Sequence, residues 1–183
     1  MDRHDWYAGM MAYARGADND DLLARMYASL YTGSGALPAG WGLPAPAFAA
    51  LLEHHFPGYP YPLSVPVESS AGRSRQAEVA DLEHLLVEHR AGRSISELWM
   101  AAIVAGACLG NDHLWQDLGL WNRADLGRLM HGNFPSLAAR NVHDMKWKKF
   151  LYKQLCEADG VRVCRAPSCE VCTDYQDCFG PEV

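Results

Sequence analysis

The segment that decides the fold class is Ser94-Ile95-Ser96-Glu97-Leu98-Trp99-Met100-Ala101-Ala102-Ile103-Val104-Ala105-Gly106. Its first four residues match a capping box, in which a serine and a glutamate three residues later satisfy backbone N–H groups at a helix start. The residues that follow are apolar and uncharged, as in a buried helix, and several are small enough to let a second helix approach closely. The segment therefore predicts a buried helix that begins at this box.

Helical spacing continues on both sides of this segment. Asn122 is placed to cap one further helix, and Pro135 suits the first turn of a short one before Asn141. The residues that mark the helical faces are Val79, Leu82, Leu85, Leu86, His89, Leu126, Leu129 and Met130. Because no alternating pattern of useful length predicts a β-strand, we expect an all-α fold with an irregular C-terminal loop.

The chain divides into three segments that we expect to form one compact unit. Residues 1–32 predict a helical hairpin, whose second helix is capped within Asp18–Asp21. Residues 33–75 form a Gly/Pro-rich connecting segment with a brief helix at 48–54, since seven of the ten prolines lie between residues 38 and 66. Residues 76–183 are the expected main helical domain, which ends in a cysteine-rich loop at 164–178.

Four cysteines crowd into that loop: Cys164, Cys169, Cys172 and Cys178. The spacing is C-x4-C-x2-C-x5-C, and its first three members repeat the C-x4-C-x2-C run of plant-type ferredoxins. In those proteins the fourth ligand comes from far along the chain, whereas here it follows after five residues. One continuous loop would therefore supply a full set of thiolates to an iron–sulfur cluster.

Two other interpretations of the cysteines remain open on spacing alone. A structural zinc site usually has two CxxC pairs separated by roughly a dozen or more residues, but this chain has only one, Cys169 with Cys172. Disulfides would need an oxidising compartment, and the N-terminus lacks the basic and apolar regions of a secretion signal. We expect a cytoplasmic protein.

Three segments of the chain carry a resemblance to a known family. They are Met145-Lys146-Trp147-Lys148-Lys149-Phe150-Leu151-Tyr152-Lys153-Gln154-Leu155-Cys156, His113-Leu114-Trp115-Gln116-Asp117-Leu118-Gly119-Leu120 and Asn133-Phe134-Pro135-Ser136-Leu137-Ala138. Together with the cysteine spacing, they resemble the NifQ family of nitrogen-fixation proteins over residues 76–181.

The resemblance implies a molybdenum–iron–sulfur protein that supplies molybdenum for assembly of the nitrogenase iron–molybdenum cofactor. Its cluster ligands would be Cys164, Cys169, Cys172 and Cys178. Its partners would be a molybdenum source such as molybdate and the nitrogenase cofactor-assembly proteins. We expect no catalytic role, because no Ser-His-Asp constellation, phosphate loop or paired-carboxylate site can be identified from the spacings. A ferredoxin-like electron carrier and a zinc-stabilised interaction domain are the alternatives.

The charge distribution argues against two classes of partner and favours a third. A net charge of −6 disfavours a general nucleic-acid binder, and no apolar run approaches the roughly 20 residues of a membrane span. Seven of the 16 basic residues nevertheless cluster around the start of the cysteine loop: Arg140, Lys146, Lys148, Lys149, Lys153, Arg162 and Arg165. Such cations would attract an anionic cluster and molybdate, unless they are only the solvated face of an amphipathic helix. The apolar face of that helix would consist of Trp147, Phe150, Leu151, Leu155 and Ala158.

Most other histidines and cysteines have no partner at ligand spacing. His113 and His131 lie at predicted helix–loop junctions, where they are candidates for a metal ligand or for a group that supports one. At the surface we expect His4, His54, His55, His84 and His89. We expect Cys108 to be a packed thiol in the apolar helix, and Cys156 to be either an auxiliary thiol or a core residue.

Overall fold

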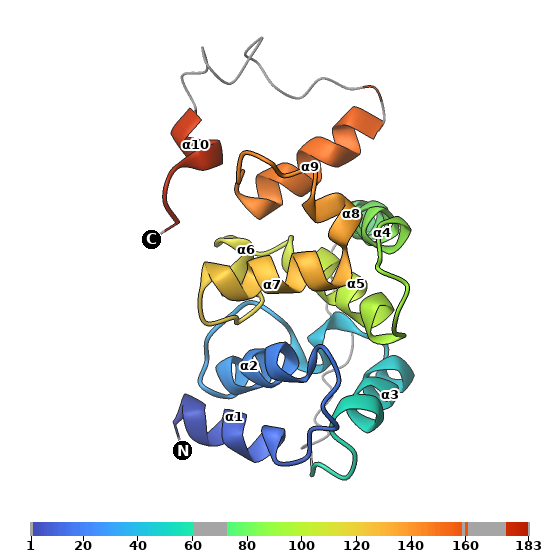
Figure 1. Ribbon diagram of the computed structural model, residues 1–183, viewed down its shortest axis with the longest axis vertical. Helices are drawn as coiled ribbons and strands as arrows, with labels where there is room; N and C mark the ends of the chain where they lie inside the picture. Colours follow the sequence, from blue (N-terminus) through green and yellow to red (C-terminus); the bar gives the residue numbers. More distant parts are fainter. Residues whose placement is uncertain (1, 61–72, 159, 161–174, 183) are drawn as a thin grey trace.

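The computed structural model describes residues 2–60, 73–158, 160 and 175–182 (Figure 1). Within these residues the chain forms helices and no strands, which confirms the all-α prediction for this part of the molecule. The elements are α1 (Arg3–Met11), α2 (Asp20–Tyr31), the 3-10 helix η1 (Ala39–Gly42), α3 (Ala45–His55), α4 (Arg73–Glu88), α5 (Ser96–Ala107), α6 (Leu114–Asp117), α7 (Arg123–Asn133), α8 (Pro135–Ala138), α9 (Trp147–Ala158) and α10 (Tyr175–Phe179).

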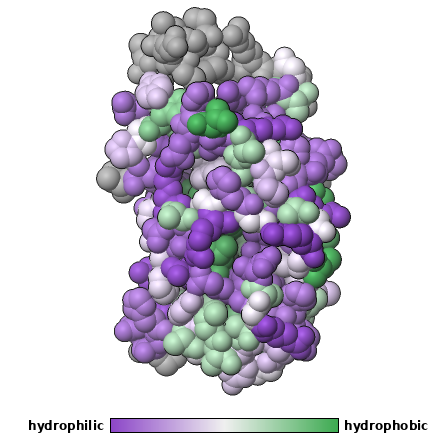
Figure 2. All heavy atoms as spheres, viewed as in Figure 1, coloured by the Kyte–Doolittle hydropathy of each residue, from purple (hydrophilic) through white to green (hydrophobic). Residues whose placement is uncertain are grey.

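The helices are stacked along the long axis of the molecule (Figure 1). Helices α1 and α2 pack together at one end, α9 and α10 lie at the other, and α5 and α7 lie between them. Helix α4 contacts both α5 and α9, so it connects the centre to the end that carries Cys178. Hydrophilic residues predominate on the face shown in Figure 2. Among the described residues, none of the helices combines the length and apolar character needed to cross a bilayer.

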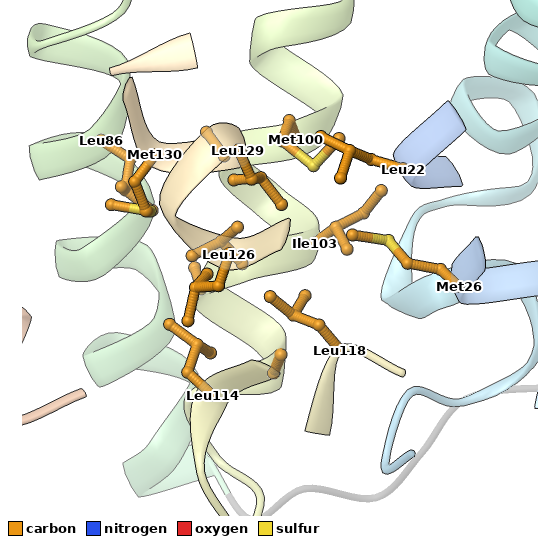
Figure 3. Packing of buried hydrophobic residues seen from close by; sticks show 14 of the residues in the cluster. Leu22, Met26, Leu86, Met100, Ile103, Leu114, Leu118, Leu126, Leu129 and Met130 are labelled. Atoms are coloured by element: carbon orange, nitrogen blue, oxygen red, sulfur yellow. The ribbon is translucent and has the colours of Figure 1, made fainter. Parts of the chain in front are cut away.

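The core is built around α5, whose Ile103 and Val104 are fully buried. Figure 3 shows side chains from α2, α4, α5 and α7 meeting here. They include Leu22, Met26, Leu86, Met100, Ile103, Leu126, Leu129 and Met130. The prediction of a buried helix in this segment is therefore confirmed.

The start of α5 differs from the predicted capping box. The helix begins at Ser96, and the Ser94 hydroxyl accepts from the backbone N–H of Ser96 at 3.2 Å rather than from that of Glu97. The other half of the box is present, because the Glu97 carboxylate accepts from the N–H of Ser94 at 3.3 Å. It also accepts from the N–H groups of Gly92 and Arg93, at 2.6 and 2.9 Å. Glu97 therefore fixes the whole turn before α5, which explains how a carboxylate can be buried here.

The N-cap of α2 lies within Asp18–Asp21, as predicted: it is Asn19, and the neighbouring Asp20 accepts from the N–H groups of Gly16 and Ala17 in the preceding loop. Two other local predictions need correction. The short helix of the connecting segment, α3, is longer than residues 48–54: Pro44 is its N-cap, and Pro46 is tolerated in its first turn, where a missing N–H costs no hydrogen bond. His55 at its end is completely buried rather than exposed.

The connecting segment packs against the core in its described part. Trp41 is fully buried in a left-handed conformation, with φ of 54°, between Gly40 and Gly42, which have φ of 73° and 76°. The two glycines allow this tight turn, since left-handed backbone has little cost without a Cβ. Residues 61–72 lie outside the described residues. The division of the chain into three segments stays a prediction.

Candidate metal-cluster site

The structure places one of the four predicted cluster ligands. Cys178 lies on α10, is partly buried and packs against the core. Cys164, Cys169 and Cys172 lie outside the described residues, so their grouping with Cys178 stays a prediction. Helices α9 and α10 flank the loop that carries these three cysteines.

Helix α10 has five residues, which is too short to be stable alone. Two hydrogen bonds from Lys146, directly before α9, hold it to the body. The Lys146 N–H donates to the carbonyl of Cys178 at 2.8 Å, and its ammonium group donates to the carbonyl of Gln176 at 3.2 Å. The rings of Tyr175 and Phe179 stack along α10 with centroids 4.6 Å apart. Cys178 is thereby carried on an element fixed at the start of α9.

Helix α9 is the amphipathic helix predicted from the sequence, directly before the cysteine loop. Trp147, Phe150 and Leu151 are buried, and Leu155 is half-buried, whereas Ala158 is exposed because the last turn extends beyond the core. Gly160 follows with φ of 71° and donates to the Glu157 carbonyl at 3.2 Å, as expected for the end of a helix.

The lysines of this region do not share one role. Lys149 is exposed and suits a solvated cationic face. Lys148 instead forms an ion pair with the buried Asp117 and donates to the carbonyls of Gly110 and Asp112, at 3.0 and 2.6 Å. The ammonium group of Lys148 is therefore used to stabilise the fold. The expectation that it attracts an anion needs correction, because Asp117 already neutralises its charge.

The two candidate histidines are both engaged by nearby groups. His113 is the N-cap of α6, and its Nδ1 lies 3.7 Å from the carboxylate of Glu182 near the C-terminus. His131 Nδ1 lies 2.9 Å from the carbonyl of Gly127, and its ring meets Trp147 of α9 edge-on. The described residues contain no group of three or more His, Cys, Asp or Glu side chains that could hold a metal ion. A ligand role for either histidine stays untested.

Sequence reasoning missed Arg123 and Glu182. Arg123 pairs with Asp144 through two hydrogen bonds of 2.6 and 3.0 Å, and its Nε lies 3.3 Å from the Glu182 carboxylate. The Glu182 side chain is only 3% exposed. A carboxylate just after a cysteine motif was the available signal, but nothing in the spacing indicates a partner 59 positions upstream.

The remaining cysteines differ from Cys178 in their surroundings. Cys108 is buried directly after α5, and this burial raises its pKa to about 12. Its thiol stays protonated at neutral pH, so it is unsuited to bind a metal as a thiolate. The expectation of a packed thiol is confirmed. Cys156 is partly buried on the last turn of α9.

A Ser-His-Asp arrangement exists although the sequence spacing did not reveal it. His55 Nε2 lies 2.8 Å from the Ser96 hydroxyl, and His55 Nδ1 lies 2.6 Å from Asp20. Each of the three residues is at most 3% exposed, and Asn19 also donates to the Ser96 hydroxyl at 2.8 Å. These buried groups satisfy one another's hydrogen-bonding capacity away from solvent. We therefore assign them a structural role, in which they hold α2, α3 and α5 together. His84 is exposed, as expected, and His89 is half-buried.

Comparison with known proteins decides the family. The NifQ family model matches residues 22–180. The chain belongs to the NifQ family, a family of nitrogen-fixation proteins. It is 47% identical over 171 residues to the NifQ protein of Azotobacter vinelandii, covering 88% of each chain. It is 37% identical over 163 residues to the NifQ protein of Rhodobacter capsulatus, covering 88% of this chain and 87% of that one.

A third NifQ protein, from Klebsiella pneumoniae, is 49% identical over 81 residues, or 44% of this chain and 48% of its own length. No solved structure matches the chain. The family assignment confirms the resemblance drawn from the segments around α6, α8 and α9.

Proposed function

We propose that this NifQ-family chain is a cytoplasmic carrier of a molybdenum–iron–sulfur cluster that donates molybdenum for biosynthesis of the nitrogenase iron–molybdenum cofactor. Its role would be delivery rather than catalysis. Family membership supports a role in nitrogen fixation, and the C-x4-C-x2-C-x5-C spacing supports thiolate ligation of an iron–sulfur cargo.

The observation that carries the proposal is the placement of Cys178. Its carbonyl accepts from the N–H of Lys146 at the start of α9, so the last cysteine of the motif is fixed to the folded body. Helices α9 and α10, which flank the segment with the other three cysteines, lie at the same end of the molecule (Figure 1). A cargo bound there would be accessible to a partner protein.

The charges in this region suit an anionic cargo. Lys146 and Lys149 lie at the start of α9, the end of that helix that carries positive partial charge. Thiolates, sulfides and molybdate all carry negative charge, and nearby cations lower their energy. Lys148 contributes less, because Asp117 neutralises it.

The cysteines would divide the work of binding. Three of the four loop cysteines, Cys164, Cys169, Cys172 and Cys178, would hold iron atoms, and the fourth or an exchangeable oxygen or nitrogen ligand would hold molybdenum. Molybdenum prefers a higher coordination number than iron, so a single protein ligand leaves positions at which an acceptor protein can compete. Open positions on molybdenum would allow the metal to be released without unfolding of the carrier.

Anaerobic isolation followed by metal and sulfide analysis tests the proposal. We expect a brown protein with iron, molybdenum and acid-labile sulfide, from which molybdenum moves to nitrogenase cofactor-assembly proteins. Cys178→Ala should lower metal content, whereas the matched variant Cys156→Ala should not. Iron and sulfide without molybdenum, with reversible one-electron cycling, would instead indicate an electron carrier. Stoichiometric zinc in a colourless protein would indicate an interaction domain.

A further inference from the structure

The position of Cys178 depends on contacts on both sides of α10. On the near side, the N–H of Lys146 donates to the Cys178 carbonyl. Lys146 itself follows a turn in which Asp144 has a left-handed backbone, with φ of 52°, and Asn141 accepts from the N–H of Met145 at 2.8 Å. The turn that presents Lys146 must hold its shape for Cys178 to hold its place.

Arg123, the first residue of α7, holds that turn. Its guanidinium group donates to both carboxylate oxygens of Asp144 and, at 3.1 Å, to the Asp144 carbonyl. A planar fork that grips side chain and backbone together restricts the turn more than a single hydrogen bond would. Asp144 is two residues before Lys146. Restricting the turn at Asp144 therefore also restricts the backbone position of Lys146, whose N–H donates to the Cys178 carbonyl.

Arg123 also holds the chain on the far side of Cys178. Its Nε lies 3.3 Å from the carboxylate of Glu182, four residues after Cys178, and His113 Nδ1 lies 3.7 Å from the same carboxylate. The Glu182 side chain is 3% exposed, so it is withdrawn from solvent toward these partners. An acid that is buried beside a cation is costly to separate from it, because the charge left behind stays desolvated.

We propose that Arg123 is a positioning residue for Cys178. By binding Asp144 and Glu182 at once, it fixes the segments on either side of the contact between Lys146 and Cys178. Helix α10 is thereby set before any cargo arrives, and ordering of this ligand costs less entropy on binding. The consequence for metal retention rests on the function proposed above, whereas the positioning itself is a property of the cluster-free protein.

Hydrogen exchange on the full cluster-free chain, read for the peptide 175–182, tests the positioning. Arg123→Gln should speed exchange of this peptide by about tenfold and leave α1 and α2 unchanged, because only the contacts of α10 are lost. Site-resolved alkylation of Cys178 should rise by a similar factor relative to Cys156. Arg128→Gln is the matched control: Arg128 lies on the same helix but pairs with Asp21 and Asp125.

The two contacts of Arg123 can be separated by a double-mutant cycle. If Arg123 acts on α10 through Glu182 as well as Asp144, then Glu182→Gln alone should speed exchange, and adding it to Arg123→Gln should change little further. Arg123→Lys, which keeps the charge but not the fork, should give an intermediate rate. Equal exchange and alkylation in Arg123→Gln and the parent would overturn the proposal, as would fully additive effects with Glu182→Gln.

Metal retention distinguishes this inference from the proposed function. If the parent binds iron and sulfide, Arg123→Gln should release iron to a chelator about tenfold faster than Arg128→Gln. Equal release rates would show that the position of Cys178 does not govern retention. If the parent binds neither iron nor sulfide, the proposed function fails, but the exchange result still decides whether Arg123 positions Cys178.

Discussion

The Lys148 ammonium group on α9 forms an ion pair with the Asp117 carboxylate at the end of α6, although the Asp117 side chain is only 1% exposed. The same ammonium group donates to the carbonyls of Gly110 and Asp112. One lysine thus satisfies a buried acid and two carbonyls of the turn between α5 and α6. Helix α9, which precedes the cysteine loop, is therefore held to the core by an ion pair as well as by apolar packing.

Replacing Lys148 should destabilise the protein. Lys148→Gln leaves the Asp117 carboxylate buried without its cation, and we expect a loss of about 3 kcal/mol in the free energy of unfolding. Lys149→Gln, one residue further on an exposed position, should change it by less than about 0.5 kcal/mol. Urea unfolding of both variants checks this, and a similar small change in each would contradict the role of the ion pair.

Gly110 should be intolerant of a side chain. A Cβ at this position would lie 2.3 Å from the Asp117 carboxyl carbon, and Lys148 prevents that carboxylate from moving away. We expect Gly110→Ala to cost about 2 kcal/mol or more through overpacking. Gly106→Ala, in α5 with open space around the site, should be neutral or stabilise by up to about 1 kcal/mol. Thermal unfolding of the two variants distinguishes them, and equal melting temperatures would refute the steric argument.

Local helix signals were readable from the sequence, but long-range polar contacts were not. Asn122 caps α7 by accepting from the N–H of Asp125 at 2.9 Å, and Pro135 opens α8, as predicted. These signals act within one turn of helix, so spacing reveals them. The burial of His55 depends instead on Ser96, 41 positions away, and no local pattern encodes such a pairing.

The same distinction applies to the candidate site. The cysteine spacing and the segments around α6, α8 and α9 were sufficient to indicate the NifQ family. Periodicity alone could not show that Lys148 is half-buried in an ion pair while Lys149 is exposed, because the partner of Lys148, Asp117, comes from another element. Similarly, the roles proposed for Arg123 and Glu182 depend on how three separate segments meet.

His55 should make stability depend on pH. Burial lowers its pKa below the ordinary value of 6.5, the nearby His54 adds to this effect, and Asp20 partly offsets it. The unfolded chain therefore binds a proton more readily than the folded one. The stability linked to neutral His55 is complete above pH 6.5 and is lost as the pH falls toward the lowered pKa, with a slope of up to about 1.4 kcal/mol per pH unit.

Urea unfolding between pH 7.5 and 5.5 measures this slope. His55→Gln should reduce the slope as well as the overall stability, since it removes the titrating group. His84→Gln is the control, because His84 is a histidine with a 75% exposed side chain, and the slope should persist there. The same slope in the parent and in His55→Gln would exclude His55 as its cause.

Cys108 should matter for packing and not for metal content. Its pKa of about 12 keeps the thiol protonated, so Cys108→Ala should lose about 1 kcal/mol of stability without loss of iron. Cys156→Ala should also keep its iron if the loop supplies all the ligands. Iron and sulfide analysis of anaerobically isolated variants checks both, and loss of the cluster in Cys156→Ala would require a fifth thiol in the ligand assignment.

The exposed basic face of α9 should influence molybdenum transfer rather than folding. Lys149 is exposed, and Lys153 pairs with Glu157 on the same helix, at 3.4 Å, so both can meet an anion or an acidic partner. Replacing both with Gln keeps helix propensity nearly constant, and we expect iron content to survive while molybdenum loading or transfer falls. Raised salt should produce the same defect in the parent, because exposed charges are screened over about 10 Å at 0.1 M. Arg15→Gln with Arg90→Gln makes an equal change in charge outside α9 and should leave transfer unchanged. Equal transfer from the lysine variant and the parent at every salt concentration would show that these lysines are only a solvated face.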